Sequence, residues 1–308
     1  MTRSLVLAAA LLAAVPVGAQ DETSPFRRTV VPGRPLCLLW PGRDYVYHLD
    51  AAGNEATPGS SEVEAIEASF DSWRAVSGTC SDFRFLRGED WSLPVAVGYD
   101  QEHRFDNYNI VTFRQQSCPD VVPADDPCWE AETCGNVYRC WEHGSATIGL
   151  TTSTFSFRDG RVLDSDIELN AAPGGGGFLF TTVDSPQCQG EPAPDCVATD
   201  VQNTMTHEIG HVVGLDHVQT PGSTMEATAP PGELQKRVID LGSAAGFCSI
   251  YPRHLPPNQC LARQGRGLTL QAEGSGTGCA AAPGPLALGA WLAALALSRL
   301  RARRREAR

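Results

Sequence analysis

The chain has 308 residues and a formal net charge of −12 at pH 7, from 24 Lys and Arg against 36 Asp and Glu. Its 42% hydrophobic and 19% charged residues are close to globular averages, which excludes general disorder. Arg3 and the segment 299–308 together hold seven of the basic residues and one acidic residue, which leaves 17 basic and 35 acidic residues between them. A body this acidic argues against nucleic-acid binding.

The first 19 residues have the three parts of a secretory signal peptide. Arg3 supplies a positive charge, Leu5 to Val15 is an apolar run, and Val17-Gly18-Ala19 offers small residues for cleavage before Gln20. The apolar run is too short to span a bilayer comfortably. We therefore expect residues 1–19 to be a signal peptide and the protein to be exported.

The next segment, 20–36, holds three prolines and little periodicity, so we expect a loosely ordered lead-in. Val63, Ile66, Phe70 and Trp73 then recur at helical spacing and predict an amphipathic helix over 63–77. Short runs of β-prone residues predict strands at 36–40, 45–49, 82–86, 93–98, 110–113 and 178–183.

A hairpin and two helices complete the predicted elements. Asp159-Gly160 separates two β-prone runs, 146–157 and 162–170, which indicates a hairpin. Helices are predicted from about 199 to 214 and over 233–251. The order of elements indicates one α/β (α+β) domain over 37–252, followed by a linker over 253–278.

Eleven cysteines are present, and setting Cys279 aside leaves an even ten. An even number in an exported chain predicts a disulfide framework. Four of the ten lie within 118–140, and Cys188 and Cys196 flank a Pro-rich loop. The spacing does not determine the pairing. A zinc site in the four-cysteine group is a minor alternative, because its spacings exceed those of Cys-x-x-Cys pairs.

The sequence Thr-His-Glu-Ile-Gly-His-Val-Val-Gly-Leu-Asp-His contains a pattern that fits a metal site. His207 and His211 are four residues apart, so one helix face presents both imidazoles to one ion. Gly214 can adopt a left-handed conformation, which lets the helix end and the chain turn His217 back as a third ligand. Three neutral imidazoles leave one tetrahedral position open for water, and Glu208 is placed to take a proton from that water.

This pattern resembles the zinc signature of the metzincin metalloproteases. Their methionine turn resembles Ser223-Thr224-Met225, and the short distance from His217 to Met225 resembles the matrixin branch of the matrix metalloproteinases. Asp240 and the segment 246–251 resemble the C-terminal helix of the family. Over 37–252 the resemblance implies a twisted, mostly parallel sheet with an active-site helix, a C-terminal helix and disulfide-stapled loops.

The resemblance implies a zinc metalloendopeptidase of the EC 3.4.24 type. In this interpretation His207, His211 and His217 hold Zn²⁺, Glu208 is the general base, and Met225 packs beneath the metal. The strand near 148–155 would pair with an extended polypeptide substrate, and the segment 226–234 would wall the pocket for the side chain after the cut bond. The alternatives are a zinc-binding adhesion or recognition module without turnover, which the presence of Glu208 argues against, and a self-processing or dedicated maturation protease with a single substrate.

The chain also departs from the matrixin pattern. Val218 stands where matrixins usually have Ser, Ala227 stands where they often have Pro, and no cysteine-switch motif is present, so the means of latency is open. The second zinc motif of the family is missing, and His103 and His143 are expected to be ordinary surface residues.

Calcium, which matrixins also carry, is an open alternative that we do not predict. Asp164, Asp166 and Glu168 on the hairpin, or Asp184 in the following loop, are the candidate ligands. Acidic positions of this kind are usually only solvated.

The C-terminal segment 279–308 begins with Cys279, continues with an apolar run over 280–298 and ends in an Arg cluster. This order resembles the myxobacterial C-terminal sorting signal called MYXO-CTERM. The resemblance implies membrane association through this segment, processing near Cys279, and display at the cell surface or outer membrane. A plain membrane anchor with an incidental cysteine is the alternative. We expect a monomer.

Overall fold

The computed structural model describes residues 25–172 and 177–260, together with the backbone of 276–281. The expected signal peptide and nearly all of the expected sorting segment lie outside these residues. Among the described residues, no helix is both long enough and apolar enough to cross a membrane.

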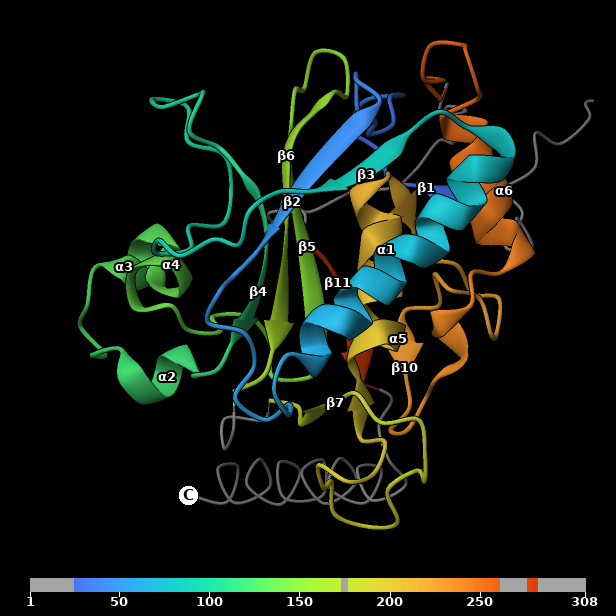
Figure 1. Ribbon diagram of the computed structural model, residues 1–308. Helices are drawn as coiled ribbons and strands as arrows, with labels where there is room; N and C mark the ends of the chain where they lie inside the picture. Colours follow the sequence, from blue (N-terminus) through green and yellow to red (C-terminus); the bar gives the residue numbers. More distant parts are fainter. Residues whose placement is uncertain (1–24, 173–176, 261–275, 282–308) are drawn as a thin grey trace, which may run out of the picture.

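A seven-stranded sheet forms the centre of the molecule, in the order β10-β11-β5-β6-β4-β2-β3 (Figure 1). Most neighbouring strands are parallel, and β5 is antiparallel to both of its neighbours. This confirms the expected mixed α/β fold with a mostly parallel sheet. The strands of the sheet are β2 (Asp44–Leu49), β3 (Arg84–Arg87), β4 (Asn109–Arg114), β5 (Thr147–Phe155), β6 (Val162–Asn170), β10 (Thr228–Ala229) and β11 (Gly276–Ala281).

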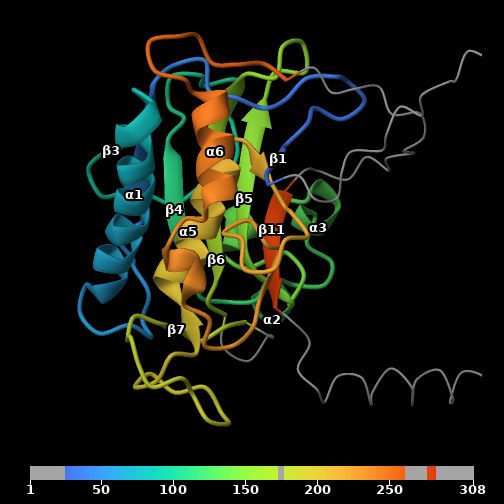
Figure 2. The same ribbon diagram turned by 90° about the vertical axis from the view of Figure 1, so that its right-hand side faces the viewer.

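The two longest helices lie side by side, and the second of them lies between the first and β5 (Figures 1 and 2). The predicted periodicity explains this packing, since Ile66, Phe70 and Trp73 of the first helix are buried. The Trp73 indole N–H donates to the carbonyl of Thr206 at 2.9 Å, which ties the two helices together. The helices are α1 (Ser61–Cys80), α2 (Cys118–Val121), α3 (Cys128–Ala131), α4 (Cys134–Tyr138), α5 (Val201–Val212), the 3₁₀ helix η1 (Gln235–Arg237) and α6 (Leu241–Ile250).

Two predicted strands and one predicted helix differ from the structure. Residues 93–98 form no regular strand, and 36–40 makes only isolated bridges at Cys37 and Leu39. The helix predicted over 233–251 begins at Leu241, because Asp240 caps it by accepting from the backbone N–H groups of the first turn. The preceding residues form η1 instead, since the Lys236 side chain is drawn into the interior.

The chain on either side of 37–252 also packs on the domain. In the expected lead-in, β1 (Arg27–Arg28) pairs with β9 (Leu215–Asp216), which follows α5. At the other end Cys260 forms a disulfide with Cys37. A further pair of short parallel strands, β7 (Phe180–Thr181) and β8 (Thr199–Asp200), leads into α5.

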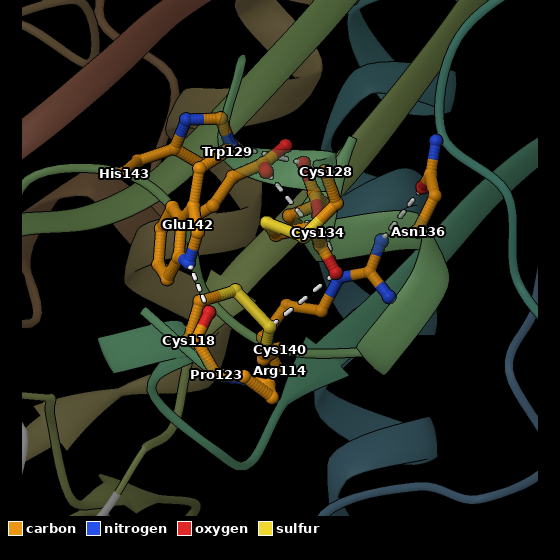
Figure 3. Close-up of a disulfide and its surroundings, with 12 residues drawn as sticks. Arg114, Cys118, Pro123, Cys128, Trp129, Cys134, Asn136, Cys140, Glu142 and His143 are labelled. Atoms are coloured by element: carbon orange, nitrogen blue, oxygen red, sulfur yellow. Dashed lines mark hydrogen bonds and ion pairs between the residues drawn. A yellow bond between two sulfur atoms is a disulfide. The ribbon is translucent and has the colours of Figure 1, made fainter. Parts of the chain in front are cut away.

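Five disulfides confirm the predicted framework and supply the pairing that spacing alone left open. Three are local: Cys118–Cys140, Cys128–Cys134 and Cys188–Cys196. The first two bring four buried cysteines into one small cluster, in the part of the chain that connects β4 to β5 (Figure 3). The zinc alternative for this group is therefore wrong, because each of its sulfurs is bonded to another sulfur. The remaining two disulfides, Cys37–Cys260 and Cys80–Cys248, join distant parts of the chain.

Two acidic side chains of β6 are buried next to each other. Asp166 accepts hydrogen bonds from the backbone N–H groups of Gly98 and Ile110, at 2.7 and 2.8 Å. Burial raises the pKa of Asp164 to about 6, and burial together with the charge of Asp164 raises the pKa of Asp166 well above its ordinary value. The pair therefore retains a proton where isolated carboxyls would have lost theirs.

The disulfide that joins α1 to α6 should contribute much more to stability than a local one. In the chain-entropy model a closed loop of 168 residues stabilises by about 5 kcal/mol and a loop of 8 residues by about 2.5 kcal/mol. We expect Cys80→Ala/Cys248→Ala to lower the free energy of unfolding by roughly 3 kcal/mol more than Cys188→Ala/Cys196→Ala. Urea denaturation measures both, and equal losses would contradict the prediction.

The Asp164–Asp166 pair should make the protein less stable as pH rises. Both folded-state pKa values are raised, so the stabilising effect of the bound proton is complete below about pH 4 and is lost as pH rises through about 6. We expect Asp164→Asn to remove part of this dependence. The free energy of unfolding of the variant should be roughly 2 kcal/mol higher than that of the wild type at pH 8, and the two should be equal near pH 4.

Denaturant titrations from pH 4 to 8 check this prediction, with the exposed residue Asp125 changed to Asn as the control. A wild type and an Asp164→Asn variant with parallel pH profiles would show that the pair does not hold the proton.

Candidate metal centre and catalytic site

Helix α5 carries two of the three histidines and is buried along its length. The Asp200 side chain caps its first turn by accepting from the Asn203 backbone N–H at 2.7 Å. The helix lies between α1 and β5, so His207 and His211 are both almost fully buried. The arrangement places their imidazoles in the interior and on one face of the helix.

The chain turns sharply after α5 and brings the third histidine to the other two. Gly214 has a φ of 90°, and a Cβ at this position would lie 2.7 Å from the carbonyl oxygen of Leu38. Only glycine meets both conditions without strain. The chain then enters β9 and reaches His217, whose Nε2 lies 3.1 Å from the Nε2 atoms of His207 and His211. The latter two Nε2 atoms are also 3.1 Å apart.

The other ring nitrogens of the helical histidines have backbone partners. His207 Nδ1 lies 2.6 Å from the carbonyl of Thr224, and His211 Nδ1 lies 2.9 Å from the carbonyl of Leu215. Because a carbonyl can only accept, Nδ1 carries the proton in each ring and Nε2 carries the lone pair. Burial lowers the pKa of His207 well below its ordinary value and that of His211 to about 3. It also lowers the pKa of His217.

Three neutral imidazoles with converging lone pairs are a donor set that fits zinc. In the part of the chain that the structure describes, this is the one group of three or more His, Cys, Asp or Glu side chains with such a geometry. The sequence pattern and the folded arrangement therefore identify the same three candidate ligands.

The carboxylate of Glu208 lies against strand β5. Its Oε2 accepts a hydrogen bond from the Thr151 hydroxyl at 2.7 Å, and the same hydroxyl lies 3.1 Å from the Glu208 carbonyl. A Cβ on Gly149 would lie 2.9 Å from Glu208 Oε1, so the strand can approach this closely only with glycine there. Sequence reasoning did not single out Gly149 or Thr151, because their importance depends on the distance between β5 and α5.

Met225 lies directly beneath the histidine-bearing helix. It is 1% exposed, and a Cβ on Gly210 would lie 2.2 Å from its sulfur, so Gly210 leaves the room that this side chain fills. The turn that holds Met225 is fixed by Asp240, whose carboxylate accepts from the Thr224 backbone N–H at 2.8 Å and from the Ser223 hydroxyl at 3.0 Å.

Asp240 thus connects α6 to the metal centre through Thr224, because the Thr224 carbonyl accepts the hydrogen bond from His207. Burial by itself would raise the pKa of Asp240, but the hydrogen bonds from Ser243, Thr224 and Ser223 hold it below its ordinary value. The sequence placed Asp240 only within a family-like helix, and its contact with the methionine turn appears only in three dimensions.

The segment after Met225 is held in place by the only lysine of the chain. Lys236 is 1% exposed, and its Nζ donates to the Thr228 carbonyl at 2.7 Å and to the Glu233 carboxylate at 2.6 Å. A cavity of about 30 Å³ lies between this segment, α5 and β5, with Ile148, Asn203 and Ala229 in its lining. Such a volume admits roughly two water molecules, so the cavity is narrow.

The other candidate ligands have partners outside the histidine centre. His103 is exposed and pairs with Asp100 at 2.8 Å, and His143 lies 3.4 Å from Glu168. Glu168 is also paired with the buried guanidinium of Arg114 at 2.6 Å. Burial would raise the pKa of Glu168, but the hydrogen bond from His143 and the charge of Arg114 hold it below its ordinary value. Asp184, on the exposed loop, pairs with Arg237 at 2.6 Å.

Comparison with known proteins gives one clear finding. A family model described as matrixin matches residues 39–251 of the chain. The match begins before β2 and ends just after α6, so it includes the whole histidine centre, the methionine turn and every strand of the seven-stranded sheet except β11. No curated protein matches the chain.

Removal of the Asp240 carboxylate should loosen the metal centre. Asp240→Ala deletes a helix cap and leaves the buried Thr224 N–H without its acceptor, which we expect to cost about 2–4 kcal/mol of unfolding free energy. Because Thr224 positions His207, we also expect zinc affinity to fall roughly 10–100-fold.

Competition with a coloured zinc chelator measures this affinity. The matched control is Asp44→Ala, which removes a partly exposed carboxylate paired with Arg84 and should change stability by less than about 1 kcal/mol. Unchanged zinc affinity in Asp240→Ala would show that the methionine turn is not held through this carboxylate.

Proposed function

The chain belongs to the matrixin family of zinc metallopeptidases, and we propose that it is an exported endopeptidase of the EC 3.4.24 type whose general base is Glu208. The observation that carries this proposal is the buried centre itself. Three imidazole Nε2 atoms lie 3.1 Å from one another. The Glu208 carboxylate, which accepts a hydrogen bond from Thr151, comes from the helix that carries two of these imidazoles.

In this proposal His207, His211 and His217 hold the zinc ion. Bound zinc would lower the pKa of a coordinated water and polarise the scissile carbonyl. The backbone carbonyls of Thr224 and Leu215 keep two of the rings oriented with Nε2 free for a metal, and burial keeps these rings in the neutral form that a metal needs. Met225 fills the space that Gly210 leaves against α5, which supports the helix that carries two of the ligands.

Glu208 carries the proton transfers. Its carboxylate accepts a proton from the attacking water and delivers it to the amine of the departing chain. The Thr151 hydroxyl donates to Oε2 and so restricts the carboxylate to one orientation. This restriction supports turnover over a merely metal-binding role, since an adhesion module has no need for a positioned carboxylate beside its metal.

The substrate is an extended polypeptide. Strand β5 runs past Glu208 and can hydrogen-bond a peptide along the edge that pairs with β11 in this structure. The narrow cavity between Ile148 and Ala229 would receive the side chain that follows the cut bond. Its small volume favours a small residue at that position.

Export and surface display remain part of the proposal. The five disulfides support an oxidising compartment, since such bonds are rare in reducing ones. The features of residues 1–19 and 279–308 support passage through a membrane and processing near Cys279.

The function is tested with unfolded protein as substrate. We expect cleavage that stops when a zinc chelator is added and returns when zinc is restored. Glu208→Ala should lower kcat by at least about 10³-fold, because the metal-ligand group among the described residues consists of histidines alone and offers no carboxylate to replace it. Zinc content by mass spectrometry should be unchanged in the variant.

Two outcomes would reject the proposal. Cleavage that survives both the chelator and Glu208→Ala would point to a contaminating protease. A folded, zinc-loaded wild type that cuts neither unfolded protein nor its own chain would favour the adhesion or recognition module.

A further inference from the structure

A segment from beyond the catalytic domain lies along the edge of the active site. The backbone of β11 (Gly276–Ala281) is placed between β5 and β10, and Figure 2 shows it beside β5. It is antiparallel to β5 over Gly276 to Ala280 and parallel to β10 at Ala280 and Ala281. The protein therefore pairs its own chain with both strands that border the histidine centre.

The register places the Cys279–Ala280 bond on the stretch of β5 that lies beside Glu208. Cys279 is the partner of Gly149, and a Cβ on Gly149 would lie 2.9 Å from Glu208 Oε1. The next residue, Ala280, is the partner of Thr147 on one side and Thr228 on the other. The ladder with β5 is interrupted between Cys279 and Ala280. At such an interruption the hydrogen-bond ladder is locally disrupted, so this peptide bond is less tied into the sheet.

The residue types of the segment suit the site. Gly276–Ala281 reads Gly-Thr-Gly-Cys-Ala-Ala, with no side chain larger than Thr. Two residues that border the narrow cavity, Ile148 and Ala229, belong to the strands that flank Ala280 and Ala281. A small residue after the cut bond is what a cavity of about 30 Å³ would accept.

We propose that this segment is a substrate of the enzyme's own active site, cut in cis at the Cys279–Ala280 bond. The proposal rests on the proposed peptidase function and names its substrate. Water adds across the peptide bond: its oxygen joins the carbonyl carbon of Cys279, and the nitrogen of Ala280 takes a proton and leaves as a free amine. The products are a catalytic chain that ends at Cys279 and a released peptide that begins at Ala280.

The covalent tether explains why a weakly binding sequence can be cut. A segment of the same chain reaches the site at an effective concentration in the millimolar range, so small residues without strong anchors still occupy it. Ten of the eleven cysteines are paired with one another, so Cys279 has no cysteine left in this chain to bond with. No disulfide therefore joins the two products, and the cut separates the catalytic domain from the Arg-rich end.

The test uses the whole chain from residue 20 to residue 308, produced by an oxidising secretory route and loaded with zinc. Intact mass spectrometry follows the C-terminus over time. We expect the wild type to lose the mass of residues 280–308, with a first-order rate constant that does not change over a 100-fold range of protein concentration. Glu208→Ala should keep its full mass, also when it is mixed with active wild type at low concentration.

A substitution in the paired strand separates substrate recognition from catalysis. We expect Ala280→Trp to slow the cut at least about tenfold, because the narrow cavity would have to admit an indole. The variant should still cut unfolded protein, which shows that it has folded. Ala287→Trp, the same change outside the paired segment, should be trimmed at the wild-type rate.

Three results would overturn the inference. A wild type that cuts unfolded protein but keeps residues 280–308 would make β11 an inhibitory strand and leave the peptidase function intact. Loss of the segment from Glu208→Ala expressed alone would assign the cut to another protease. A rate that rises in proportion to concentration would assign it to a second copy of the chain. Loss of all cleavage, by contrast, would count against the peptidase function itself.

Discussion

The two hydrogen bonds from imidazole Nδ1 atoms to backbone carbonyls are the constraint on which the metal centre depends. They set the tautomer of His207 and His211 and fix the ring planes, while burial keeps both rings neutral. Both acceptors lie downstream of the helix that carries the histidines, so the centre forms only if the chain after α5 folds back correctly. The first turn of the chain is at Gly214, directly after α5. The second is the methionine turn, which Asp240 holds by accepting from the Thr224 backbone N–H.

Strand β5 links this metal centre to peptide recognition. Its inner side approaches α5 so closely that Gly149 has no room for a side chain, and Thr151 orients the Glu208 carboxylate. Its edge carries the backbone groups that pair with β11. The same short strand thus sets the distance between a bound chain and the proposed general base. Displacement of this strand would change both binding and proton transfer.

Outside the centre, covalent bonds and buried ion pairs hold the domain. Two disulfides staple the segment between β4 and β5, and the neighbouring Arg114–Glu168 pair is almost completely buried. Three of the candidate calcium ligands, Asp166, Glu168 and Asp184, hydrogen-bond to or pair with protein groups. Cys80–Cys248 and Cys37–Cys260 close large loops, which limits the freedom of the unfolded chain most.

The sequence by itself determined the local chemistry of this protein. The spacing of His207, Glu208 and His211 needs only helical geometry to bring the side chains together, and Gly214 needs only its own backbone freedom to end the helix. Asp159-Gly160 between two β-prone runs likewise led to the correct hairpin, because turn residues act over a few positions. The mixed α/β class followed from the order of such elements.

Only the tertiary structure decided which distant residues meet. The cysteine pairing, the contact of Thr151 with Glu208, the burial of Lys236 and the support from Asp240 all join positions far apart in the chain, and no local pattern encodes them. Local rules also failed between 233 and 240. The predicted helix does not form there, because Lys236 is buried and Asp240 caps a helix that begins only at Leu241. The placement of β11 beside β5 is of the same kind, since a strand edge pairs with whichever segment the fold brings to it.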